Sequence, residues 1–123
     1  MAVKGLGSDI VELARIREVM AEKGQRFLDK VLTKGEKEYC KQYSDAAPHV
    51  AGRFAAKEAV VKALGCGFGA EVAFLDIEIL KDEKGKPTVF LSEKVKAHFD
   101  EPIMHISITH SREHAFAVAI WDV

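Results

Sequence analysis

The sequence is poor in cysteine, with two among 123 residues. Cys40 and Cys66 are too few for a disulfide framework, and neither belongs to the paired spacing of a cysteine zinc site. Disulfides are rare in proteins of the cytosol. We therefore expect two reduced thiols in a cytoplasmic protein.

Long apolar runs are also lacking. A helix that spans a bilayer needs about 20 predominantly apolar residues in a row, and no stretch of this sequence approaches that length. The first residues include one lysine but no apolar run of signal-peptide length, and charges return at Asp9 and Glu12. The sequence therefore predicts no membrane segment.

The chain has almost no net charge, −1 at pH 7. General nucleic-acid binders carry an excess of Lys and Arg, so we expect no nucleic-acid partner. The balance is uneven, because residues 1–34 hold seven Lys/Arg and five Asp/Glu whereas residues 70–101 hold five and eight. This pattern is either ordinary solvated surface or a basic first third that binds an acidic partner, with candidate cations at Arg15, Arg17, Lys23 and Arg26.

The spacing of apolar residues changes halfway along the chain. Helical spacing predicts helices at 10–23, at 26–32, after a cap at Thr33, and at 49–64. Alternation predicts strands at 74–80, 89–91, 103–109 and 115–121, with a short extended opening at 3–6 and a short helix capped by Ser92. The predicted class is α+β, with helices mainly in the first half and an antiparallel sheet in the second half, in one domain over residues 1–123.

The first candidate site is Gly7-Ser8-Asp9-Ile10, which we place at a strand-to-helix junction. An aspartate at such a junction is most often an N-cap, where its carboxylate accepts backbone N–H bonds. A residue that takes part in chemistry is the alternative interpretation.

The second candidate site lies in the helix predicted at 49–64, in the segment from Phe54 to Lys62. Glu58 and Lys62 are four residues apart and share one helix face, which is typical of an exposed ion pair. Small and apolar residues surround this pair, however. A carboxylate and an ammonium on such a surface also suit a magnesium–phosphate site, because oxygen ligands hold the cation and the lysine neutralises phosphate charge.

The third candidate site is the segment from His105 to Ser111, which contains the serines Ser107 and Ser111. Strand alternation puts His105, Ser107 and Thr109 on one face and His110 on the other. Neither serine is in a nucleophile elbow, and His110 and His114 straddle a predicted turn, so a zinc site is not expected. A structural role is the alternative interpretation for either histidine.

The first two motifs together resemble those of the phosphopantetheinyl transferases, above all the short class of holo-acyl-carrier-protein synthases. That family has Gly-x-Asp near its start and, about fifty residues later, an aromatic residue, two small residues, Lys-Glu-Ala and a further Lys. Gly7 to Ile10 and Phe54 to Lys62 match this pattern, and the similarity continues through Gly65-Cys66-Gly67, Gly85-Lys86-Pro87 and Ser107 to His110.

The resemblance implies a phosphopantetheinyl transferase-like fold and a reaction. The chain would move 4′-phosphopantetheine from coenzyme A to a serine of apo-acyl carrier protein, in support of fatty acid biosynthesis, and release 3′,5′-ADP. Asp9 and Glu58 would bind Mg²⁺, Lys62 would neutralise phosphate charge, and Glu58 or a water molecule would be the base. Arg53, His105 and His110 are further candidates for binding coenzyme A.

The resemblance also implies an assembly. A single-module chain of this family needs a second subunit to complete its cleft, and the short class forms a homotrimer. The row Ala115, Ala117 and Ala119 would allow close subunit contact or packing within one chain. Two rival functions stay open: another magnesium-dependent phosphoryl or nucleotidyl transferase, and a non-enzymatic module that binds acidic helices.

Overall fold

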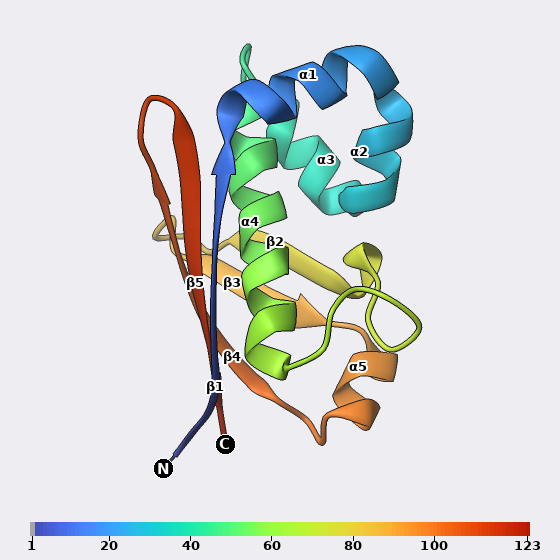
Figure 1. The fold of residues 1–123 in the computed structure, drawn as a ribbon, viewed down its shortest axis with the longest axis vertical. Coiled ribbons are helices and arrows are strands. Elements are labelled where there is room, and N and C mark those ends of the chain that lie inside the picture. Colours follow the sequence, from blue (N-terminus) through green and yellow to red (C-terminus); the bar gives the residue numbers. More distant parts are fainter. Residues whose placement is uncertain (1) are drawn as a thin grey trace.

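The computed structural model describes residues 2–123. These residues form five strands, five α-helices and one 3₁₀ turn (Figure 1). In chain order they are β1 (Val3–Glu12), α1 (Leu13–Lys23), α2 (Gln25–Val31), α3 (Lys34–Cys40), α4 (Ala47–Leu64), η1 (Phe74–Asp76), β2 (Ile77–Lys81), β3 (Pro87–Leu91), α5 (Glu93–His98), β4 (Ile103–His110) and β5 (His114–Asp122).

The strands form two antiparallel sheets, one of three strands in the order β1-β5-β4 and one of two strands, β2-β3. The helix α4 runs along the larger sheet, with α1, α2 and α3 grouped at its N-terminal end and α5 near its C-terminal end (Figure 1). The predicted α+β class with an antiparallel sheet is confirmed. The N-terminal strand β1 also belongs to this sheet, although more than a hundred residues separate Asp9 from its partner Ala117.

Small side chains bring α4 close to the sheet. Ala115, Ala117 and Ala119 of β5 are fully buried, as are Ala55 and Ala59 of α4. The alanine row therefore packs within the chain, which decides between the two interpretations of its role.

Three predicted boundaries are wrong. The opening strand predicted at 3–6 continues to Glu12. The helix predicted from residue 10 begins at Leu13, because β1 stays paired with β5 as far as Glu12. The strand predicted from residue 74 begins at Ile77, because the carboxylate of Asp76 accepts the backbone N–H of Ala73 at 2.8 Å and closes a 3₁₀ turn.

The predicted helix caps are confirmed. Thr33 and Glu36 form a reciprocal capping box at α3, and the Ser92 hydroxyl accepts the Val95 N–H at 3.3 Å at α5. Both cysteines are free thiols. Within residues 2–123, no helix combines the length and the apolar composition needed to cross a membrane.

Candidate active site

The site is built on a direct contact between β1 and α4. A Cβ atom on Gly7 would lie 2.1 Å from the carbonyl oxygen of Ala59 and 2.6 Å from the backbone nitrogen of Ala63. Only glycine permits this approach, since no real side chain tolerates such distances. The contact places the next inward-facing residue of the strand, Asp9, against the helix face that carries Glu58 and Lys62.

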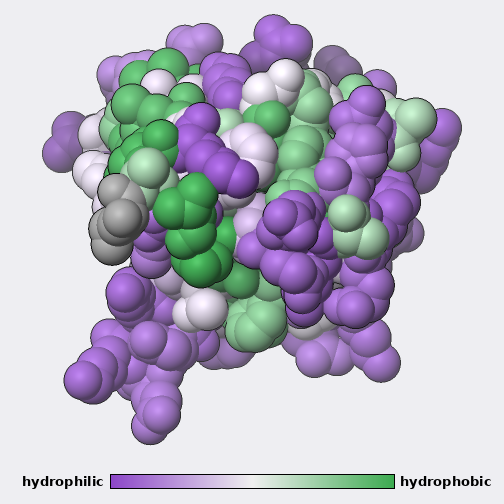
Figure 2. Space-filling model, turned by 90° about the horizontal axis from the view of Figure 1, so that it is seen from below, coloured by the Kyte–Doolittle hydropathy of each residue, from purple (hydrophilic) through white to green (hydrophobic). Residues whose placement is uncertain are grey.

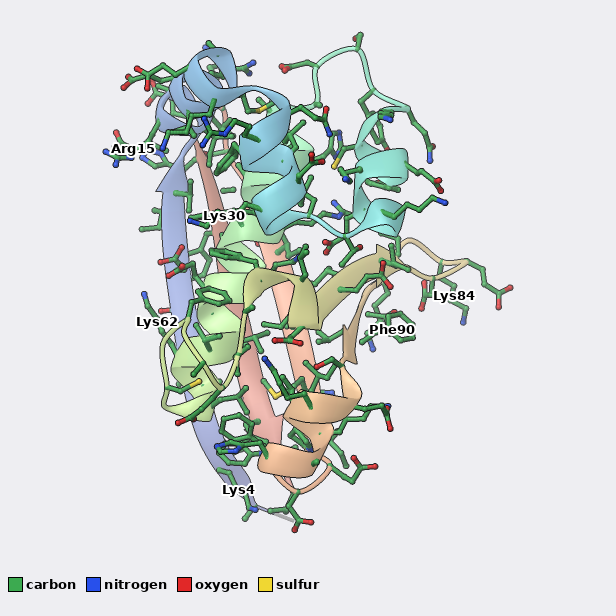
Figure 3. All side chains as sticks on the ribbon, turned by 90° about the vertical axis from the view of Figure 1, so that its right-hand side faces the viewer. Lys4, Arg15, Lys30, Lys62, Lys84 and Phe90 are labelled. Carbon is green, nitrogen blue, oxygen red and sulfur yellow. The ribbon has the colours of Figure 1, made fainter. Side chains whose placement is uncertain are left out.

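Asp9 and Lys62 are joined across this contact. The Lys62 ammonium donates to the Asp9 carboxylate at 3.1 Å and to the carbonyl oxygen of Ser8 at 3.0 Å. The Asp9 side chain is 17% exposed and that of Lys62 52%, so the ammonium reaches the site from solvent (Figure 3). Asp9 lies inside β1 and is not an N-cap, so its predicted position at a strand-to-helix junction is wrong.

Glu58 faces the same contact. Burial raises the pKa of the Glu58 carboxyl, the negative charge of Asp9 raises it further, and Lys62 lowers it. Two carboxylates that repel one another at a partly buried site are a donor set that suits a hard divalent cation. No group of three or more His, Cys, Asp and Glu side chains within residues 2–123 could hold a metal. A magnesium ion between Asp9 and Glu58 would therefore need water or phosphate oxygens as its other ligands.

A first cavity of about 640 Å³ opens at this pair of acids. Asp9 and Glu58 line it together with Arg15, and its apolar wall includes Phe27 and Phe54. Acids and one cation converge here on an apolar cleft, which is the usual composition of a ligand site.

A second cavity of about 700 Å³ continues the first, with Arg15, Val19, Phe27 and Phe54 in both. Its rim is basic and adds the predicted cations Lys23 and Arg26, together with Lys30. Arg17 does not belong to this surface. Its guanidinium makes two hydrogen bonds to the Asp45 carboxylate, at 2.8 and 2.9 Å.

The remaining predicted ligand residues lie elsewhere in the chain. Arg53 and His110 line a separate cavity of about 190 Å³ with His49 and Lys81. Arg53 is buried and donates to the carbonyl oxygen of Ile79 at 3.1 Å, while the His110 ring lies 2.9 Å from the carbonyl oxygen of Pro48.

His105 is on the outer face of the larger sheet, 3.4 Å from the Asp122 carboxylate. One chain therefore brings Asp9, Glu58 and Lys62 together at the cleft. Arg53, His105 and His110 lie outside that cleft. Their role in binding coenzyme A stays a prediction.

Sequence reasoning missed an aromatic wall beside the site. The ring of Phe54 lies 6.3 Å from Phe27 and 5.4 Å from Phe74, and Phe74 stacks on Phe68 at 3.8 Å. The position of Phe54, four residues before Glu58 on the same helix face, was a usable signal. Phe27 on α2, and Phe68 and Phe74 before β2, lie far from Phe54 in the sequence. No local pattern predicts that their rings form one wall with it.

The pKa of Glu58 predicts an effect on stability. The pKa of Glu58 in the folded chain lies above its value of about 4.3 in the unfolded chain. Ionised Glu58 therefore destabilises the metal-free fold, and the free energy of unfolding falls as the pH rises from the unfolded to the folded pKa. Glu58→Gln should therefore raise the melting temperature at pH 7 without metal, and the difference should vanish near pH 3. Calorimetry checks this, with Glu18→Gln on the exposed face of α1 as the control. A lower melting temperature at pH 7 would contradict the assigned environment.

Comparison with known proteins gives the family. The sequence profile of the 4′-phosphopantetheinyl transferase superfamily matches residues 5–119. The holo-[acyl-carrier-protein] synthase of Protochlamydia amoebophila is 50% identical over 118 residues, which cover 96% of this chain and 97% of the relative. That of Halothermothrix orenii is 43% identical over 123 residues and 98% of each chain.

Solved structures agree with the sequence relatives. The holo-[acyl-carrier-protein] synthase of Neisseria meningitidis superposes with a TM-score of 0.93 at 31% identity, over 99% of this chain and 100% of that one. The Helicobacter pylori protein, solved in complex with coenzyme A, gives a TM-score of 0.88 at 37% identity, over 95% and 99%. The matched residues include both motifs that build the cleft, and the chain belongs to the 4′-phosphopantetheinyl transferase superfamily.

Proposed function

We propose that this chain is a holo-acyl-carrier-protein synthase that acts in the cytoplasm, in support of fatty acid biosynthesis. It transfers 4′-phosphopantetheine from coenzyme A to a serine of apo-acyl carrier protein and releases 3′,5′-ADP. The observation that carries the proposal is the meeting of Asp9, Glu58 and Lys62 at one cleft. The comparisons also support the proposal, because relatives that align with nearly the whole chain are holo-[acyl-carrier-protein] synthases.

The residues of the cleft suit a displacement at phosphorus. The serine oxygen forms a bond to the β-phosphorus of coenzyme A, the bond from that phosphorus to the bridging oxygen breaks, and 3′,5′-ADP leaves with the bond electrons. Asp9 and Glu58 would hold magnesium, which supplies positive charge to the pyrophosphate when bound. The Lys62 side chain is half-exposed, and its ammonium would exchange its bond to Asp9 for a phosphate oxygen.

The serine proton goes to Glu58 or to a water molecule that Glu58 orients. A general base works best when its pKa approaches the pH of the reaction. In the metal-free chain, burial and the charge of Asp9 raise the pKa of the Glu58 carboxyl in that direction, and a bound magnesium ion would oppose both effects. The same carboxylate is therefore placed to bind the ion and to assist the nucleophile.

The reaction class has a direct test. The protein, coenzyme A, magnesium chloride and apo-acyl carrier protein are incubated together, and the nucleotide is analysed by chromatography. We expect 3′,5′-ADP in equal amount to the modified carrier and none after addition of EDTA. Release of another nucleotide would indicate a different magnesium-dependent transferase, and no release at all would indicate a binding module.

The basic rim of the second cavity is the proposed docking surface for the carrier protein. Arg15 borders both cavities, so a partner bound on this rim lies next to Asp9 and Glu58. Arg15 and Lys62 lie on the β1 side of the molecule (Figure 3). An acidic partner at this surface would present its serine to the metal site.

Reversing the charge of Arg15 tests the docking surface. Arg15→Glu should weaken carrier binding by about tenfold or more, because like charges then face one another. Coenzyme A affinity should fall less, although Arg15 also lines the first cavity. Lys84→Glu makes the same charge change in the exposed β2–β3 turn (Figure 3) and serves as the control. Titrations at two salt concentrations measure both affinities. A carrier affinity that changes neither with Arg15→Glu nor with the salt concentration would show that the carrier binds to another surface.

The outer face of the larger sheet is the proposed contact of a homotrimer. Leu6 and Ile10 of β1 are 66% and 63% exposed, and Phe116 of β5, paired with Ile10, is exposed as well. Apolar surface also gathers at the end that carries the termini (Figure 2), where Val3 and Ile103 are exposed. Exposed apolar surface of this extent is typical of an interface.

The trimer would bring His105 of one chain to the cleft of the next. Trimers made only of Asp9→Ala chains, or only of His105→Ala chains, should lose activity. When the two variants are mixed 1:1, dissociated and reassembled, about a quarter of wild-type activity should return. About a quarter of the interfaces then combine a native Asp9 from one chain with a native His105 from the next. Native mass spectrometry, which resolves the different masses of the two variant chains, shows whether mixed trimers form. Mixed trimers without recovered activity would contradict a shared site.

A further inference from the structure

Lys57 immediately precedes Glu58 in α4, yet its side chain lies in the interior. Both Lys57 and Glu36 are fully buried. The Lys57 ammonium donates to the Glu36 carboxylate at 2.6 Å, to the carbonyl oxygen of Val31 at 2.7 Å and to that of Phe74 at 3.1 Å. An ammonium has three N–H donors, so each has one acceptor.

Glu36 extends the same connection. One of its oxygens also accepts the N–H of Thr33 at 2.8 Å, and the other accepts the N–H of Ile79 at 2.7 Å. The pair thus joins α4 to the end of α2, the start of α3, the turn η1 and the strand β2. All of these elements pack around α4 and are linked to it through this one ion pair.

Stability alone does not account for this pair. Burial lowers the pKa of the Lys57 ammonium, and Glu36 opposes that effect. Apolar residues of similar volume often replace a buried ion pair with no loss of stability. What apolar residues cannot supply is directed hydrogen bonds, which fix three separate backbone segments at defined distances from α4.

Those segments carry the wall of the proposed docking surface. Val31 and Phe74, whose carbonyl oxygens bind Lys57, both line the second cavity. The helix that ends at Val31 also carries Arg26 and Lys30 of the basic rim. Glu58, in contrast, is fixed by the contact of α4 with β1, which does not involve Lys57.

We propose that the Lys57–Glu36 pair is a positioning device that sets the distance between the basic wall on α2 and η1 and the acids of the cleft. This role rests on the proposed function, because it assumes that the wall binds the carrier protein. Lys57 touches neither Asp9 nor Glu58 among the hydrogen bonds given by the structure. Its loss should therefore act on carrier binding and leave the reacting groups in place.

The test removes both charges together. Lys57→Met alone would strand a buried carboxylate, so the variant is Lys57→Met with Glu36→Gln, which keeps the side-chain lengths. The matched control is Lys37→Met with Asp29→Asn, an exposed ion pair of 2.7 Å between α2 and α3. Steady-state kinetics and titration with apo-acyl carrier protein are measured below the melting temperature of each variant.

We expect the buried double variant to raise the KM and the Kd for the carrier about tenfold, with kcat and the KM for coenzyme A within about twofold of wild type. The control should change neither. A lower melting temperature with an unchanged carrier KM and Kd would overturn the proposal, as would a loss confined to kcat. If the wild-type chain transfers nothing, the proposed function fails, whereas the carrier titration still decides the positioning role.

Discussion

Asp9→Ala and Glu58→Gln should each reduce phosphopantetheine transfer by roughly 100- to 1000-fold without unfolding the chain. Each variant removes one of the two carboxylates that face each other at the contact of β1 with α4. On the proposed function, the magnesium ion then loses a negative ligand, and the pyrophosphate loses part of its charge compensation. Initial rates at saturating coenzyme A and carrier measure the effect, and far-ultraviolet circular dichroism checks the fold.

The control for this pair is Glu38→Gln, an exposed carboxylate on α3. It should leave the rate unchanged. Titration with Mn²⁺, followed by electron paramagnetic resonance, gives a readout apart from activity, and both site variants should bind the ion more weakly. Wild-type rates in either folded site variant would show that the two acids do not hold the magnesium ion on which the proposed reaction depends.

Gly7→Ala is expected to cause the second large effect. The added methyl group would lie 2.1 Å from the carbonyl oxygen of Ala59, which is backbone and cannot move aside. Overpacking of this kind costs about 1–3 kcal/mol or more. The strand must shift away from α4 and take Asp9 with it, so both the melting temperature and the transfer rate should fall.

Gly69→Ala is the matched control for Gly7→Ala, since a Cβ there would meet nothing within 4 Å. Calorimetry and initial rates on the two variants distinguish the general effect of replacing a glycine from the effect of disturbing the close contact between β1 and α4. Equal effects of the two substitutions, or full activity of Gly7→Ala, would contradict the assigned role of the β1–α4 contact.

Local patterns predicted the elements whose stability is local. The capping box of Thr33 with Glu36 and the cap at Ser92 each join residues three positions apart, and both are present. The start of α1 was predicted wrongly because Ile10, Leu13 and Ile16 have helical spacing. Ile10 instead lies on the exposed face of β1, and its pairing with Phe116 of β5 is not visible in the local sequence.

The candidate site shows the same division. The shared face of Glu58 and Lys62 follows from their spacing along one helix, and the motif pointed to Asp9. The reason Asp9 reaches that face is the fit of Gly7 against Ala59, which requires the three-dimensional path of β1. The Lys57–Glu36 pair joins residues 21 positions apart. Helical spacing indicates that Lys57 points about 100° away from Glu58, but it does not indicate that the Lys57 side chain is buried.

Mass spectrometry of the carrier protein tests the central claim most directly. Apo-acyl carrier protein is incubated with this chain, coenzyme A and magnesium, then digested, and the peptide that holds the modified residue is fragmented. We predict a gain of one phosphopantetheine group on a single serine, absent with EDTA and strongly reduced with Glu58→Gln. An unmodified carrier after full incubation with the folded wild-type protein would contradict the account.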